Sequence, residues 1–141
     1  IQNIEFVGRM FAECARVLTS SGSMYIVMNH PTFRIPKATS WGWDEKNVSQ
    51  YRRVDAYLSE SKNNIDMHPG DKNQKDTTKT ISFHRPLQFY VKAFGAHGFM
   101  LARLEEWISH KKSTPGVRQK EEDRIRKEIP LFMFLHIKRV N

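Results

Sequence analysis

The segment Met24-Tyr25-Ile26-Val27-Met28-Asn29-His30-Pro31 decides the fold of this chain, because an apolar run leads directly into a turn that carries polar side chains. An apolar run of this length is typical of a strand that is buried on both faces of a sheet. The preceding residues 6–18 repeat apolar side chains at three- and four-residue spacing, which predicts an amphipathic helix. Ser20-Ser21-Gly22 ends that helix. The order of these elements predicts an α/β fold.

The second half of the chain continues this pattern. Pro86 favours the first turn of a helix that ends near Gly95 and Gly98, and residues 99–107 follow as a strand. A charged helix is expected over residues 117–128, and residues 131–138 form the last strand candidate. The first two strands and their helical crossover fit a right-handed unit of a parallel sheet. Three strands leave sheet edges unprotected, so the remaining strands are expected from a preceding half or another chain.

Residues 31–85 are too long and too aromatic for an ordinary connection, and we interpret them as an insertion that forms a lid. Residues 50–58 and 79–84 are strand candidates that could pair with each other. The polar residues 59–78 between them are expected to be mobile. The chain thus reads as one partial domain, with a helix and buried strand in 1–30, the lid in 31–85, and helix, strand, charged helix and final strand in 86–141.

The turn after Arg16-Val17-Leu18, which feeds a buried strand, resembles the helix and fifth strand of class I S-adenosylmethionine-dependent methyltransferases. Longer stretches resemble a branch of the type 11 methyltransferase-domain family: Asn29-His30-Pro31-Thr32-Phe33-Arg34-Ile35-Pro36, Ser40-Trp41-Gly42-Trp43-Asp44, Tyr51-Arg52-Arg53-Val54-Asp55, Met67-His68-Pro69-Gly70, His84-Arg85-Pro86-Leu87 and Glu105-Glu106-Trp107. The resemblance covers nearly the whole chain, but only the carboxyl-terminal half of such an enzyme. It implies a Rossmann-like sheet whose last strand inserts antiparallel between the two before it.

The resemblance also implies that the whole enzyme methylates a small molecule with S-adenosylmethionine. Donor sites of this fold use a glycine-rich turn after the first strand, and no Gly-x-Gly-x-Gly occurs in this chain. The cofactor-binding residues are therefore unknown. We expect a missing amino-terminal half to bind most of the S-adenosylmethionine, and this chain alone to be inactive.

The candidate catalytic residues are Asn29 and His30, because ligands of open α/β sheets bind at the carboxyl ends of the strands. Asn29 could hydrogen-bond the acceptor, and His30 could accept its proton. The alternative is that His30 only shapes the turn before Pro31 and satisfies backbone groups.

Further candidates could bind the acceptor. His84 and Arg85 precede a helix, whose amino end favours an anionic group. A carboxylate or phosphate on the acceptor could also bind the arginines of the insertion, Arg34, Arg52 and Arg53. Ion pairs with Asp44, Asp55 or Glu60 are the structural alternative. An aromatic wall could form from Trp41, Trp43, Tyr51 and Tyr57, although these side chains could equally pack the insertion onto the domain.

The net charge of +8, from 23 Lys and Arg against 15 Asp and Glu, raises the possibility of an anionic partner. The basic residues are mostly interleaved with acidic ones, as in residues 118–128, which argues against nucleic acid. Two alternatives stay open: a basic non-catalytic module that binds nucleic acid or an acidic protein, and a methyltransferase-like regulatory subunit. A metal site is not expected, because His30, His68 and His84 lie far apart in the sequence.

No apolar run approaches the roughly 20 residues that span a bilayer, so no membrane association is expected. The single Cys14 excludes a disulfide within the chain and favours the cytoplasm. The start at Ile1, directly before a helix, suggests a piece of a longer protein. An exposed sheet edge predicts self-association into a homo-oligomer.

Overall fold

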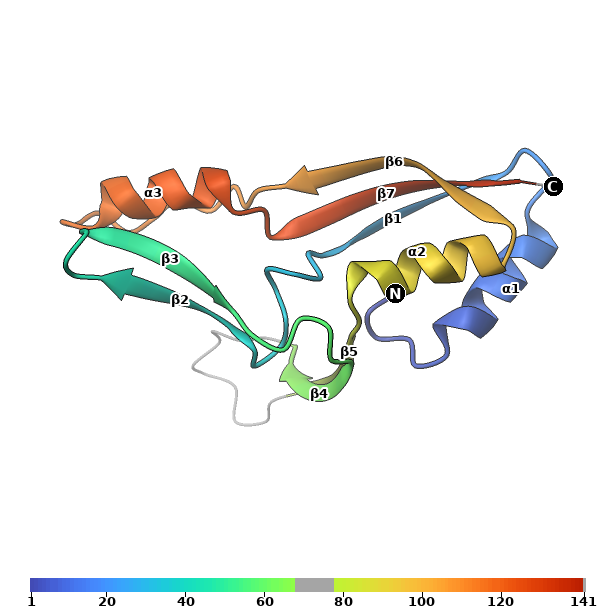
Figure 1. Ribbon diagram of the computed structural model, residues 1–141, viewed down its shortest axis with the longest axis horizontal. Coiled ribbons are helices and arrows are strands. Elements are labelled where there is room, and N and C mark those ends of the chain that lie inside the picture. The colour runs from blue at the N-terminus through green and yellow to red at the C-terminus, as the bar shows by residue number, and fades with distance from the viewer. Residues whose placement is uncertain (68–77, 141) are drawn as a thin grey trace.

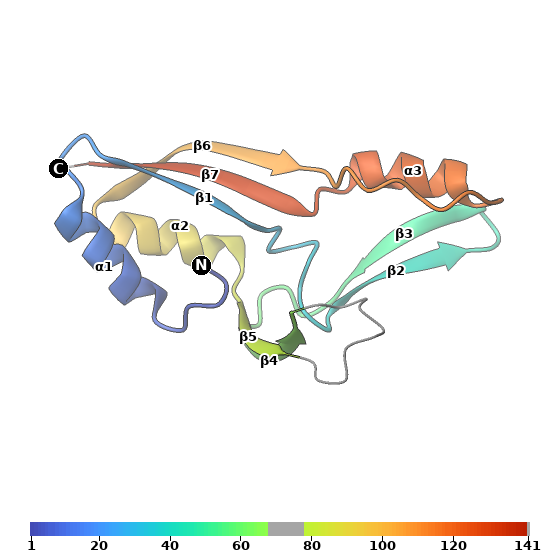
Figure 2. The same cartoon turned by 180° about the vertical axis from the view of Figure 1, so that it is seen from behind.

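The computed structural model describes residues 1–67 and 78–140. Its centre is a three-stranded sheet of β1 (Ser23–Asn29), β7 (Phe132–Arg139) and β6 (Phe99–Trp107). Helices α1 (Val7–Val17) and α2 (Leu87–Ala96) lie on the same side of this sheet (Figures 1 and 2). The helix and strand positions predicted for the two ends of the chain are confirmed within about two residues, the usual uncertainty of element ends.

Strand β7 lies between β1 and β6 and is antiparallel to both, so β1 and β6 run parallel to each other. This confirms the expected order, in which the last strand inserts between the two before it. The register between β6 and β7 shifts between Leu101 and Arg103, where β6 carries one unpaired residue. The carboxyl ends of β1 and β6 therefore meet at the same edge of the sheet.

The hydrophobic core lies between this sheet and the two helices. Val7 and Phe11 of α1 and Tyr90 and Phe94 of α2 are almost fully buried against the sheet. The rings of Phe11 and Phe94 meet edge to face, with centroids 5.1 Å apart. The sheet contributes every second side chain of its central strand, Met133, Leu135 and Ile137.

The opposite face of the sheet is open. Tyr25 and Val27 are 67% and 59% exposed, so the prediction that β1 is buried on both faces was wrong. Within the described residues, both helices that pack on this sheet lie on the other face. The open face carries stacked aromatic side chains instead, with Tyr25 against His136 at 4.6 Å and Trp107 against Phe134 at 5.3 Å between ring centroids.

The insertion forms two separate hairpins. Strands β2 (Thr39–Asp44) and β3 (Ser49–Val54) pair with each other, as do β4 (Ser61–Asp66) and β5 (Lys79–His84). The expected pairing of residues 50–58 with 79–84 was therefore wrong. A local turn explains the first hairpin, because Asp44 Oδ1 accepts the backbone N–H groups of Lys46 at 2.9 Å and Asn47 at 3.1 Å.

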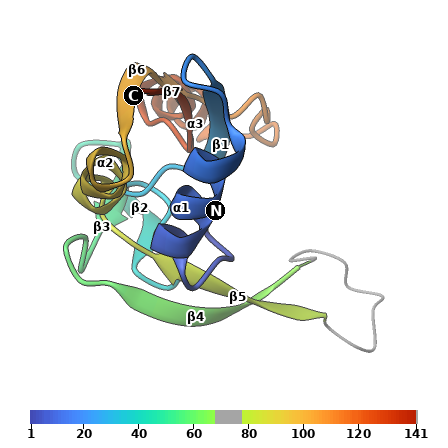
Figure 3. The same cartoon turned by 90° about the vertical axis from the view of Figure 1, so that its right-hand side faces the viewer.

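The predicted mobile segment 59–78 contains strand β4, so that prediction was wrong for its first part, and residues 68–77 lie outside the described residues. Hairpin β4–β5 is held to the amino-terminal segment: Phe83 N–H donates to the Gln2 carbonyl at 2.7 Å, and the Asn3 amide donates to the Ile81 carbonyl at 2.8 Å. Figure 3 shows this hairpin at the far side of the molecule from the three-stranded sheet.

Helix α3 (Gln119–Glu128) lies beside β3, at the other end of the molecule from α1 (Figure 1). Glu121 of α3 accepts the Gln50 backbone N–H at 3.1 Å, which ties the helix to the first hairpin. Among residues 1–67 and 78–140, none of the helices combines the length and the apolar character needed to cross a bilayer.

Candidate functional site

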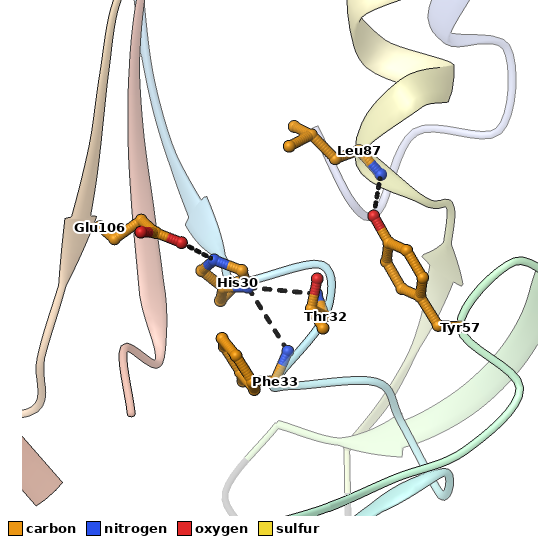
Figure 4. Close-up of polar contacts among 6 residues, drawn as sticks. All are labelled: His30, Thr32, Phe33, Tyr57, Leu87 and Glu106. Carbon is orange, nitrogen blue, oxygen red and sulfur yellow. Dashed lines mark hydrogen bonds and ion pairs between the residues drawn. The ribbon is translucent and has the colours of Figure 1, made fainter. Parts of the chain in front are cut away.

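The candidate site lies at the sheet edge where β1 and β6 end. Asn29 is the last residue of β1, and His30 follows it, beside Glu106 of β6 (Figure 4). Ligands of open α/β sheets bind outside this edge. The sequence-based placement of Asn29 and His30 at this edge agrees with the structure, while their chemical roles stay predictions.

Both ring nitrogens of His30 have partners. Nδ1 accepts the backbone N–H groups of Thr32 at 3.1 Å and Phe33 at 3.4 Å, as Figure 4 shows. Nε2 therefore carries the ring hydrogen and donates it to Glu106 Oε1 at 2.9 Å. The His30 residue is only 4% exposed. These contacts fit the turn-shaping alternative, and action as a base requires that Nδ1, which carries the lone pair, be released from the two backbone N–H groups.

Asn29 is held at its backbone by Gln2. The Asn29 N–H donates to Gln2 Oε1 at 2.9 Å, and the Gln2 amide donates back to the Asn29 carbonyl at 3.2 Å. This pair satisfies the outer edge of β1 at its last residue and leaves the Asn29 side chain at the wall of a cavity. The role of Gln2 could not be predicted from the sequence, because 27 residues separate it from Asn29.

This cavity, the β1 cavity, has a volume of about 580 Å³ and lies between the end of β1, the following loop and both hairpins. Small-molecule sites commonly have volumes of about 300–1,000 Å³. Arg34, Lys37 and Arg52 supply three positive charges to its wall, against the single carboxylate of Asp66. Ile35, Pro36, Ile65 and Met67 supply an apolar part.

The two arginines of the β1 cavity differ in their contacts. Arg52 donates from Nε at 2.9 Å and Nη2 at 2.6 Å to the Phe33 carbonyl, and its guanidinium lies 4.7 Å from the centre of the Trp41 ring. Arg34 lies 4.9 Å from the centre of the Phe132 ring. Burial lowers the pKa of Arg34, and burial together with the Arg34 charge lowers the pKa of Arg52. Two partly desolvated cations that repel each other favour an anion between them.

A second cavity of about 520 Å³ lies at the end of β6 and is lined by Glu106, Trp107, Ile108, His110 and Phe132. Phe132 links it to the β1 cavity, because the same ring lies under the Arg34 guanidinium. Glu106 lines the second cavity and binds His30, so this cavity leads to the polar end of β1. Glu106 belongs to Glu105-Glu106-Trp107, one of the stretches that carry the family resemblance, but it was not predicted as a site residue.

His84, Arg85 and Tyr57 come together in a separate cluster below α2. His84 Nε2 lies 2.8 Å from the Tyr57 carbonyl oxygen, and the Tyr57 hydroxyl accepts the Leu87 N–H at the start of α2, as Figure 4 shows. Arg85 donates to the carbonyls of Ile4 at 3.1 Å and Glu5 at 2.6 Å. These contacts hold the amino-terminal segment in place, and binding of an acceptor by this cluster stays a prediction.

The remaining predicted residues lie on the first hairpin and do not form one wall. Strand alternation places Trp41 and Trp43 on one face of the hairpin, and Tyr51 and Arg53 on the other. Trp43 packs under Arg118, whose guanidinium carbon is 4.4 Å from the ring centre, so this tryptophan faces α3. Arg53 and Tyr51 are exposed, and Arg53 pairs with Asp55 at 2.8 Å, the expected structural alternative. Trp41 reaches the β1 cavity only through Arg52.

No group of three or more His, Cys, Asp or Glu side chains within the described ranges is arranged to hold a metal ion; His68 lies outside them. The described glycines do not form a nucleotide cradle at the site edge. Among the described glycines, Gly98 has a positive φ, of 72°. It lies in the turn before β6, at the end of the sheet away from the candidate site. Residues 1–67 and 78–140 therefore do not form a glycine-rich donor loop.

An α/β sheet with a reversed last strand between two parallel strands, and with cavities at the carboxyl ends of those strands, defines the fold class of this chain. The fold is that of part of two solved methyltransferase structures. An S-adenosylmethionine-dependent methyltransferase from Mesorhizobium loti matches with a TM-score of 0.68 and 21% identity, over 98% of this chain and 57% of that one. A putative S-adenosylmethionine-dependent methyltransferase from Listeria monocytogenes matches with a TM-score of 0.68 and 20% identity, over 99% and 57%.

The chain thus spans 57% of the length of each of these two structures. No protein-family model and no curated protein matches the sequence. At about one identical residue in five, the likeness establishes the fold alone. Membership of the type 11 family stays a prediction.

Proposed function

We propose that this chain is the acceptor-side part of a class I S-adenosylmethionine-dependent methyltransferase that acts on a small molecule. The observation that carries the proposal is the fold likeness to two such enzymes over nearly the whole chain. The cavities at the ends of β1 and β6 support it, because they lie where open α/β sheets bind their ligands.

The donor-binding part belongs, in this proposal, to the portion of those enzymes that this chain does not match. Two observations support this division. Among the described strands, β1 pairs with β7 alone, so the other edge of β1 is available to a further strand up to Asn29, where Gln2 binds. The open sheet face also exposes Tyr25 and Val27, which a helix or another segment would cover.

The chain's own residues would position the acceptor and exclude water. The Asn29 amide would orient the acceptor at the mouth of the β1 cavity. His30 would accept a proton at Nδ1 once that nitrogen is released from the Thr32 and Phe33 N–H groups. Glu106, which accepts the Nε2–H at 2.9 Å, would stabilise the resulting imidazolium. The hairpins and the loop after β1 would form the lid.

The test is methyl transfer by the natural protein that carries this sequence. The protein is incubated with tritiated S-adenosylmethionine and pools of small organic molecules, and the label is followed into the small-molecule fraction. We expect transfer by the natural protein and none by residues 1–141 alone. Label that enters only nucleic acid or protein, or no transfer by either sample, would contradict the proposal.

A further inference from the structure

We infer that the β1 cavity binds an organic acid and that Arg34 pairs with its carboxylate. The identification of this acid as the methyl acceptor rests on the proposed function. The anion site itself rests only on the contacts, burial and charges of the cavity.

Arg34 is a partly buried cation with an unused hydrogen-bonding edge. Its guanidinium stacks on Phe132, which covers one face of the group and leaves its N–H donors in the plane. Among residues 1–67 and 78–140, no hydrogen bond or ion pair engages those donors. A partly buried guanidinium without a polar partner is costly, and a carboxylate that accepts two parallel N–H bonds satisfies it.

Arg52 fixes the second charge and cannot serve as the main ligand. Its Nε and Nη2 already donate to the Phe33 carbonyl, and Nη2 also donates to Thr39 Oγ1 at 2.9 Å. Arg52 therefore holds the loop that carries Arg34 while adding positive potential to the cavity. The contribution of Arg52 to binding is therefore electrostatic, whereas Arg34 can donate two parallel N–H bonds to a carboxylate.

Two neutral polar side chains at the same wall also lack partners. In the part of the chain that the structure describes, neither the Asn29 side-chain amide nor the Ser82 hydroxyl makes a hydrogen bond. Ser82 is only 5% exposed, and both residues line the β1 cavity. A ligand with oxygen atoms near Arg34 would hydrogen-bond to these two groups at the cavity wall.

The cavity also has room for an apolar body. Ile35, which is 2% exposed, and Ile65 and Met67 line the cavity away from the sheet. The unengaged Arg34 guanidinium, the supporting charges of Lys37 and Arg52, and an apolar wall fit an organic acid with a hydrocarbon or aromatic part. The Asp66 carboxylate at the same wall disfavours a second negative charge on the ligand.

Binding to residues 1–141 tests this inference without any methyl transfer. Benzoate, its neutral counterpart benzamide, and phenyl phosphate are titrated into 15N-labelled protein, and the arginine Nε–Hε resonances are followed. We expect benzoate to shift the Arg34 resonance and to bind at least about tenfold more tightly than benzamide. Arg34→Gln should weaken benzoate binding by about tenfold or more, and Arg34→Lys should weaken it less.

Arg16→Gln is the matched control, because Arg16 is an exposed arginine on α1, paired with Glu13. Ser82→Ala is a second cavity variant, expected to weaken benzoate binding by a smaller factor, and circular dichroism confirms folding of each variant. Three results would overturn the inference: equal binding of benzoate and benzamide, benzoate binding unaffected by Arg34→Gln, or tighter binding of phenyl phosphate. Benzoate binding without methyl transfer by the natural protein would reject the proposed function alone, and transfer to a neutral acceptor would reject the anion site as the acceptor site.

Discussion

His30 Nε2 and Glu106 Oε1 lie 2.9 Å apart and join the ends of β1 and β6, two parallel strands that are separated by β7. The His30 side chain is 5% exposed and the Glu106 side chain is 54% exposed, so the pair connects the protein interior to the surface at the candidate site. It connects the turn after β1 to the wall of the second cavity.

Glu106→Ala should lower the free energy of unfolding by about 1 kcal/mol, because the buried Nε2–H of His30 loses its partner. Glu106→Gln keeps an acceptor oxygen at the same place and should cost less. Urea unfolding followed by circular dichroism measures both. Equal stability of the alanine variant and the original chain would show that the contact is not maintained in solution.

His30→Asn separates the two roles of this histidine, since the asparagine Oδ1 can replace Nδ1 as acceptor of the Thr32 and Phe33 N–H groups. The variant should keep the turn while lowering kcat of the natural protein by about a hundredfold or more, the usual contribution of a general base. The measurement is kcat as a function of pH. Unchanged kcat in a folded variant would show that His30 shapes the turn and does not act as a base.

Tyr90→Phe should leave the free energy of unfolding unchanged or raise it by up to about 1 kcal/mol. The Tyr90 hydroxyl is buried and has no hydrogen-bond partner of good geometry among the described residues, and burial raises the pKa of its phenol. Thermal and urea unfolding measure the change. A clear loss of stability would show that this hydroxyl has a favourable partner, such as the nearby Arg85.

The contact between Asp123 of α3 and Ser113 in the preceding loop should stabilise the chain less in acid. Hydrogen bonds from the Ser113 hydroxyl and backbone N–H hold the pKa of Asp123 below its usual range. The folded-state pKa lies below the unfolded value of about 3.9, so the stabilisation is complete above that value and is lost as the pH falls through the folded pKa. Asp123→Asn should reduce the fall in stability between about pH 5 and pH 2, measured by urea unfolding. An unchanged acid profile would contradict this.

The open sheet face should drive self-association of the chain. Val27→Lys places a charge in the centre of this face and should shift the mass measured by light scattering toward the monomer. Val117→Lys, at a fully exposed residue in the loop before α3, is the control and should not change the mass. A monomer for the original chain at high concentration would reject self-association.

The elements of the sheet unit were predictable because their apolar periodicity is strong and local. Strand β4 was not, since Ser61-Lys62-Asn63-Asn64-Ile65-Asp66 is polar and gains its structure from pairing with β5 and docking near Gln2 and Asn3. The burial of β1 was overestimated because burial depends on what covers the sheet, and the sequence of one strand does not contain that information.

The candidate site was predictable in part for the same reason. Asn29 and His30 follow an apolar run, so their place at the strand end could be predicted. Glu106 is 76 residues from His30, and only the return of β6 beside β7 brings the two together. The hairpin aromatics could not be assigned to a common surface without the register of β2 and β3.

Calorimetric binding of S-adenosylhomocysteine tests the central claim most directly. It is measured on residues 1–141 and on the same reading frame extended upstream of Ile1 in the source DNA. We predict that the extended protein binds it with one site per chain and that residues 1–141 alone do not. An extended protein that fails to bind would contradict assignment to the S-adenosylmethionine-dependent methyltransferases, and binding by residues 1–141 alone would contradict the division of donor and acceptor sites.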